Sequence, residues 1–165
     1  MLRKGKTMGY ETHIVIGFLG DPVPELAKDL TNPYEDGSGY PYKKDKAGNP
    51  IKTGRMQRYL MPAVHLDLSK IDYSNLDLLH DKYLKVTEEN QNEFVYFYHS
   101  DRCTEFSEDN YGDPLVLVPF KDVLEAVRTD VQNSDYRRFR WLLGLMEAMA
   151  LTDNSKHLVC VFYGT

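Results

Sequence analysis

The chain has 165 residues, of which 42% are hydrophobic and 27% charged, a composition typical of one globular domain. Its net charge of −5 makes it a poor candidate for general nucleic-acid binding, because that affinity comes mostly from cations that neutralise phosphates. Cys103 and Cys160 lie too far apart for a zinc motif, and no apolar run is long enough to cross a membrane. We therefore expect a single cytoplasmic domain without membrane association.

The N-terminal part predicts one strand behind a short leader. Residues 1–7 form a loose, basic leader with no apolar signal region, and either Met1 or Met8 can be the natural start. Residues 9–18 alternate between two faces, with aliphatic side chains on one face and His13 on the other. This alternation is typical of a strand.

The next segments are less regular. Asp21 followed by Pro22 predicts a short helix over residues 22–30, since aspartate caps helices and proline suits the first helical position. Residues 31–58 carry many turn signals and cations. They predict an irregular basic hairpin excursion with its tip near Gly48, too short to bury a core of its own.

The rest of the chain predicts further strands and helices. β-branched and aromatic residues indicate strands over residues 59–68, 93–100, 115–118 and 157–163. Apolar residues at steps of three and four indicate helices over residues 74–86, 119–131 and 134–151. The helix over 134–151 is apolar on both faces from Trp141 onward, so we expect it to be the central core helix.

The order of these elements predicts an α+β fold in a single domain, residues 1–165. We expect a mixed or mostly antiparallel sheet with two C-terminal helices packed on one face. The basic hairpin excursion should lie at the edge of that sheet.

Three histidines lie on or at the end of predicted strands, each two residues from an acid. The pairs are His13 with Glu11, His65 with Asp67, and His99 with Asp101. Residues two apart in a strand lie on the same face, so each histidine shares a face with its acid. Imidazoles and carboxylates together suit a divalent metal or an oriented general base. If the strands are neighbours, the predicted metal set is His13, His65, Asp67, His99 and Asp101. Alternatively these histidines are structural, because acids are abundant and known metal and two-histidine signatures are absent.

A second candidate site is basic. Its members come from the excursion and from the start of the last helix: Tyr42, Lys43, Lys44, Lys46, Lys52, Arg55, Arg58, Arg137, Arg138 and Arg140. Tyrosine stacks and cations neutralise, and a helix start offers free N–H groups to an anion. Alternatively these cations are solvated or pair with the domain's own acids, such as Asp130.

These patterns favour a small non-enzymatic binding protein that contacts an acidic protein surface or a small phosphorylated ligand, with no cofactor. Two alternatives stay open: a divalent-metal-dependent, phosphoesterase-like hydrolase that uses the histidine set, and an obligate homo-oligomer with an aromatic strand interface. A lone cysteine such as Cys103 is more typical of packing than of a nucleophile. The small size and rich tyrosine content would suit an accessory or inhibitor protein, such as those of viruses.

Overall fold

A computed structural model describes residues 11–29, 42–68, 75–90, 93–99, 104–133 and 137–164. The expected leader at residues 1–7 lies outside these ranges, as do Asp101 and Cys103.

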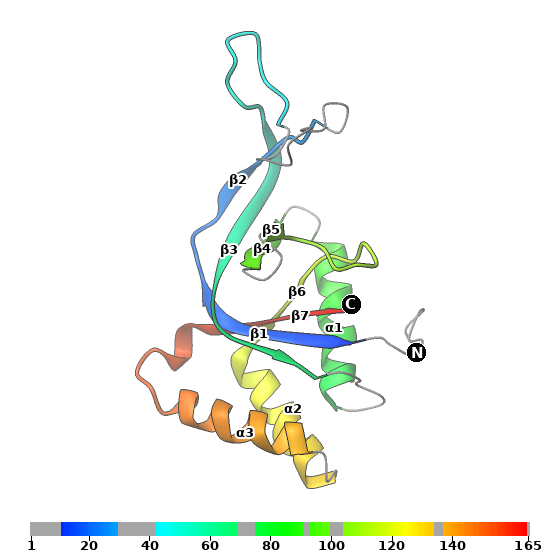
Figure 1. Ribbon diagram of the computed structural model, residues 1–165, viewed down its shortest axis with the longest axis vertical. Helices are drawn as coiled ribbons and strands as arrows, with labels where there is room; N and C mark the ends of the chain where they lie inside the picture. Colours follow the sequence, from blue (N-terminus) through cyan, green and yellow to red (C-terminus); the bar gives the residue numbers. More distant parts are fainter. Residues whose placement is uncertain are drawn as a thin grey trace.

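The described chain forms one curled sheet with its helices gathered to one side (Figure 1). The strands are β1 (Thr12–Leu19), β2 (Val23–Leu26), β3 (Lys52–Asp67), β4 (Glu93–His99), β5 (Thr104–Phe106), β6 (Val116–Pro119) and β7 (Leu158–Gly164). The helices are α1 (Asn75–Glu89), α2 (Phe120–Asn133) and α3 (Arg137–Ala150), followed by the short 3₁₀ turn η2 (Ser155–His157). The strand order is β5-β4-β3-β1-β7-β6, and β2 pairs with β3.

The predicted α+β fold with a mostly antiparallel sheet is confirmed. Among the described strands only β3 and β4 pair in parallel. The predicted C-terminal strand, β7, lies between β1 and β6, and its side chains are almost all buried. A strand that is paired on both edges and covered on both faces needs this continuous apolar sequence.

The curl of the sheet has a local cause in β3. Ile16 of β1 pairs with Val64, but the next residue, Gly17, pairs with Pro62. Ala63 is therefore an extra residue in β3, which makes a β-bulge. A bulge bends its strand and increases the local twist.

The bulge also changes which face each side chain of β3 occupies. Leu60 and Val64 lie an even number of residues apart, yet they pack into cores on opposite faces of the sheet. Gly17 allows the close crossing at this point, because a Cβ there would lie 2.1 Å from the carbonyl oxygen of Met61. The second half of β3 thus pairs with β1, while its first half turns away to pair with β2 and β4.

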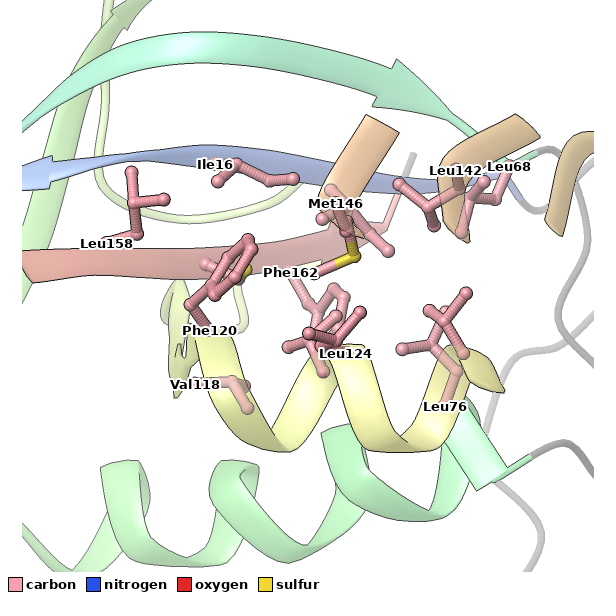
Figure 2. Close-up of a cluster of buried hydrophobic side chains, with 14 of the residues drawn as sticks. Ile16, Leu68, Leu76, Val118, Phe120, Leu124, Leu142, Met146, Leu158 and Phe162 are labelled. Atoms are coloured by element: carbon pink, nitrogen blue, oxygen red, sulfur yellow. The ribbon is translucent and has the colours of Figure 1, made fainter. Parts of the chain in front are cut away.

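The larger core lies between the sheet and the helices (Figure 2). It combines aliphatic and aromatic side chains of the sheet with those of all three helices, among them Ile16, Val118, Phe162, Leu76, Phe120, Leu124, Leu142 and Met146. Each of these side chains is at most 6% exposed, so this face of the sheet is dry. We call it the helix-covered face, and the opposite face the concave face.

The expectation that the helix over 134–151 is the central core helix is wrong. α3 buries one stripe, Phe139, Leu142 and Met146, whereas Trp141 is 69% exposed. α2 contacts both α1 and α3, so α2 is the central helix of the layer and α3 lies at its edge. Its second apolar face therefore stays in contact with solvent.

α1 is held at its N-terminus by a residue of α2. The buried carboxylate of Asp130 accepts hydrogen bonds from the backbone N–H groups of Asn75 (2.8 Å) and Leu76 (3.0 Å) and from the Asn75 side chain (3.0 Å). An acid at this position satisfies free N–H groups and complements the helix dipole. Asp130 therefore caps α1, and no contact in the described part of the chain joins it to Arg137 or Arg140.

The expected helix over residues 22–30 is also wrong, because this segment contains strand β2. Val23 and Pro24 pair with β3 in antiparallel fashion. β2 has β3 as its partner strand and lies at an edge, where a proline without an N–H is tolerated. Pairing with the long strand β3 overrides the local helix signal.

The predicted hairpin tip is confirmed, but the irregular segment ends earlier than expected. The Asp45 side chain accepts hydrogen bonds from Ala47 N and Asn49 N, both at 2.9 Å, and Gly48 has a φ of 84°. Residues 52–58, expected to be irregular, are the first half of β3. Within the described ranges, no helix is long and apolar enough to span a membrane.

Candidate functional site

β1, β3 and β7 bring two of the predicted histidines together on the concave face. His13 is paired with Asp67 on one side and with Tyr163 on the other. The Nε2 atom of His65 lies 3.3 Å from His13 Nδ1 and 2.9 Å from the Tyr163 hydroxyl oxygen. The His13 and Tyr163 rings stack, with 4.7 Å between their centroids. We call these residues the histidine cluster.

Two carboxylates border the histidine cluster. One ligand atom each from Glu11, His13 and Asp67 lies within 4.8 Å of the others. Glu11 Oε2 is 3.9 Å from His13 Nε2, the ring nitrogen that does not face His65. Glu11 was not in the predicted metal set, although its spacing from His13 places the two on the same strand face.

The other two members of the predicted metal set are not placed. β4 ends at His99, whose backbone pairs with Thr104, but its side chain lies outside the described part of the chain, as does Asp101. Phe97, two residues before His99, is 6.4 Å from the His65 ring. A contribution from His99 or Asp101 stays a prediction.

The structure does not gather the predicted basic residues into one site. Lys43, Lys44 and Lys46 lie in the hairpin at one end of the molecule, whereas Arg137 and Arg140 lie on α3 at the other end (Figure 1). The side chain of Arg138 lies outside the described residues. The hairpin lysines and the arginines at the start of α3 are therefore two separate basic regions.

Three other members of the basic set contact the protein itself. Arg55 Nε lies 3.4 Å from Glu25 Oε2, and its guanidinium sits over the Phe94 ring at 4.7 Å. Tyr42 is half-buried and pairs with Lys28 across the base of the hairpin. Arg58 donates a hydrogen bond from Nε to the Gly20 carbonyl oxygen at 3.0 Å. Lys52 is exposed at the start of β3.

Arg58 also lines a cavity of about 410 Å³ beside α1. We call this cavity the α1 pocket. Its wall combines the C-terminal half of α1 with residues of β4, β6 and β7 on the concave side. The apolar part of the wall includes Val86, Phe94, Val95, Leu115, Leu117 and Val159. The volume lies within the range of about 300–1,000 Å³ that is usual for small-molecule sites.

Cations outnumber acids around the α1 pocket. Arg58 and the exposed Lys156 line it, and Glu93 is the one acid on the described wall. The bond from Arg58 Nε to Gly20 holds the guanidinium in place, and its Nη groups have no partner within the described residues. The sequence marked Arg58 as an anion contact, but nothing in it indicated that Lys156 and the apolar wall lie nearby.

Tyr83 and Cys160 each have a raised pKa. Tyr83, on the pocket wall, donates a 2.5 Å hydrogen bond to Asp122, and this bond, with burial, raises the pKa of Tyr83 to about 12. Burial raises the pKa of the Cys160 thiol well above its usual range. Both groups are protonated at neutral pH, so neither is a nucleophile there.

No family model, curated protein or solved structure matches this chain. A functional assignment therefore depends on the geometry of the chain's own residues.

Proposed function

We propose that this chain is a small, non-enzymatic binding protein whose α1 pocket takes a small anion with an apolar body. The observation that carries the proposal is the Arg58 guanidinium. It is held by Gly20 and presents at an apolar cavity Nη groups that have no partner in the part of the chain that the structure describes. A fixed guanidinium offers paired donors to a carboxylate, sulfonate or phosphate.

The apolar wall supports a ligand with an apolar body rather than a bare anion. Ligand pockets are mostly apolar, and a few polar groups fix the orientation of the ligand. Val95 and Leu115 are buried at the base of the α1 pocket, while Val86 is 50% exposed at its rim. A ligand could thus bury an apolar body against the base and keep its charge near Arg58 and Lys156.

The setting that we propose is cytoplasmic. Cys160 is a free, buried thiol, and reduced cysteines are typical of that compartment. An acidic protein surface, the other predicted partner, would instead meet the exposed lysines of the hairpin. Exchanging Lys43, Lys44 and Lys46 for glutamate should then abolish that contact and leave the fold intact.

Binding to the α1 pocket can be measured with two fluorescent probes of similar shape. Anilinonaphthalene sulfonate carries a negative charge, and phenylnaphthylamine does not. We expect one site per chain, and a roughly tenfold loss of affinity for the sulfonate in Arg58→Gln. The neutral probe should bind Arg58→Gln nearly as well as the unchanged protein.

Two further variants test whether the charge and the cavity of the α1 pocket hold the probes. Lys46→Gln removes the same charge from the hairpin and should leave both affinities unchanged. Val86→Trp places a large ring at the rim and should weaken both probes. Near-ultraviolet circular dichroism must show native packing in every variant, since the sulfonate also binds loosely packed chains. Equal losses in Arg58→Gln and Lys46→Gln would contradict the proposal.

The two alternatives from the sequence remain predictions. An aromatic oligomer interface would need residues other than Phe97 and Tyr163, because both are 2% exposed within a single chain. A hydrolase would need a metal held by the part of the predicted histidine set that the strands bring together, His13, His65 and Asp67.

A further inference from the structure

We propose that Glu11, His13 and Asp67 bind a divalent transition-metal ion at the rim of the concave face, with His65 and Tyr163 positioning the His13 ring. This site is separate from the α1 pocket and does not depend on the function proposed for it.

The three ligand atoms already converge. They come from two neighbouring strands and from the residue just before β1, and they lie within 4.8 Å of one another. Around a metal with bonds of about 2.0–2.2 Å, ligand atoms stand roughly 3–4 Å apart. The His13 Nε2 to Glu11 Oε2 distance is already 3.9 Å. Glu11 and Asp67 are both exposed, so their carboxylates can rotate inward to close the remaining gap.

His13 is oriented as a metal ligand would be. Its Nδ1 atom faces His65 Nε2 at 3.3 Å. In the tautomer that puts the His13 lone pair on Nε2, the Nδ1–H group donates to His65 Nε2, which shares its one lone pair with the Tyr163 hydroxyl at 2.9 Å. Nε2 then carries the lone pair that a metal would need, and it lies 3.9 Å from Glu11 Oε2. Ligating histidines usually donate their second ring N–H in this way, which fixes the tautomer and the ring orientation.

Tyr163 adds rigidity to this arrangement. Its ring lies nearly parallel to that of His13, with an interplanar angle of 9°, and its hydroxyl is hydrogen-bonded to His65. Tyr163 is 2% exposed and is fixed within the core of the concave face. The buried Tyr163 therefore contacts both histidines and restricts their positions, although His65 itself is exposed.

A simple ion pair between His13 and Glu11 accounts for this geometry less well than a metal does. That pair would use one carboxylate, whereas the site presents two beside a single imidazole. A divalent cation would bind the imidazole and both carboxylates at once.

The ligand types indicate which metals fit. One imidazole and two carboxylates suit zinc, manganese, iron or cobalt in the divalent state. Three protein ligands leave further coordination positions for solvent, as in catalytic rather than structural zinc sites.

The test titrates the full chain, purified without a histidine tag, with zinc chloride in a calorimeter and with cobalt chloride by visible absorption. We expect one ion per chain. His13→Ala and Asp67→Asn should each weaken binding by about 100-fold, and His65→Ala by about 10-fold to 100-fold with unchanged stoichiometry. The cobalt ligand-field bands should disappear in His13→Ala.

His157→Ala is the matched control, because His157 is an exposed histidine on η2 and outside the cluster. It should bind like the unchanged protein. Asp67→Asn keeps shape and size at an exposed position, so it stays informative if His13→Ala fails to fold. Binding that survives both Asp67→Asn and His13→Ala would overturn the site, and so would the absence of saturable binding of either metal. Arg58→Gln should leave metal affinity unchanged, which separates this result from the α1 pocket.

Discussion

The helix-covered face and the concave face are built from the same strands but are filled differently. Ile14 and Phe162 pack against the helices, whereas their chain neighbours Val15 and Tyr163 face the concave side. The helices supply enough apolar surface to close one face completely. On the other face the core is smaller, and the α1 pocket and the histidine cluster lie beside it. Candidate ligand-binding groups therefore collect where packing is incomplete.

The largest expected effect compares one leucine from each face. Leu142→Ala empties a fully buried position on the helix-covered face and should lower the free energy of unfolding by about 2–5 kcal/mol. Leu117→Ala removes a half-buried side chain that already borders the α1 pocket, so its loss should be about 1 kcal/mol. Urea unfolding followed by circular dichroism measures both. Equal losses would mean that the two faces are equally well packed.

The next prediction tests the crossing that separates the two faces. Gly17→Ala places a methyl group against the Met61 carbonyl and should cost about 1–3 kcal/mol of unfolding free energy. Gly144→Ala is the matched control, because its Cβ would meet no atom within 4 Å. In the middle of α3 it should stabilise the protein by about 0.5–1 kcal/mol. The thermal unfolding midpoints of the two variants should therefore shift in opposite directions. A midpoint in Gly17→Ala that is unchanged or raised would show that the crossing does not require a glycine.

The smallest effect concerns Tyr83, which packs against the core of the helix-covered face and also lines the α1 pocket. Its folded pKa of about 12 lies above the ordinary value of 10. The hydrogen bond from protonated Tyr83 to Asp122 raises the free energy of unfolding below about pH 10. This contribution is lost as the pH rises from 10 toward 12, because the unfolded chain then loses the proton before the folded chain does. Tyr83→Phe should cost about 1 kcal/mol at neutral pH and less at alkaline pH.

Phenolate absorbance provides the direct measurement for Tyr83. In Asp122→Asn the acceptor loses its charge, so the pKa of Tyr83 should fall back toward its ordinary value. A titration curve that is the same in the unchanged protein and in Asp122→Asn would show that Asp122 does not control this tyrosine.

Local patterns sufficed for much of the fold. The alternation around His13 assigned both faces of β1, and the helical spacing of the apolar side chains located α1 and α2. The period of two along a strand also predicted that His65 and Asp67 share a face of their strand, as they do in β3. Such signals depend on neighbours within a few residues, which a sequence displays directly.

Other features depended on contacts between distant segments. Asp21 and Pro22 predict a helix start, yet residues 23–26 form strand β2 because they pair with β3. Trp141 lies on an apolar helix face, yet the sheet and α2 leave no room for that face inside. Local propensity differs by fractions of a kcal/mol per residue, so tertiary pairing and packing easily override it.

The sequence by itself located strands β1, β4, β6 and β7 and all three helices, and it assigned the two faces of β1, because side-chain periodicity encodes such local features. The tertiary structure alone decided that Ala63 is a bulge, that Arg58 meets an apolar cavity with Lys156, and that His13, His65 and Tyr163 meet. These outcomes depend on strand order and on the curl of the sheet, which no local pattern contains.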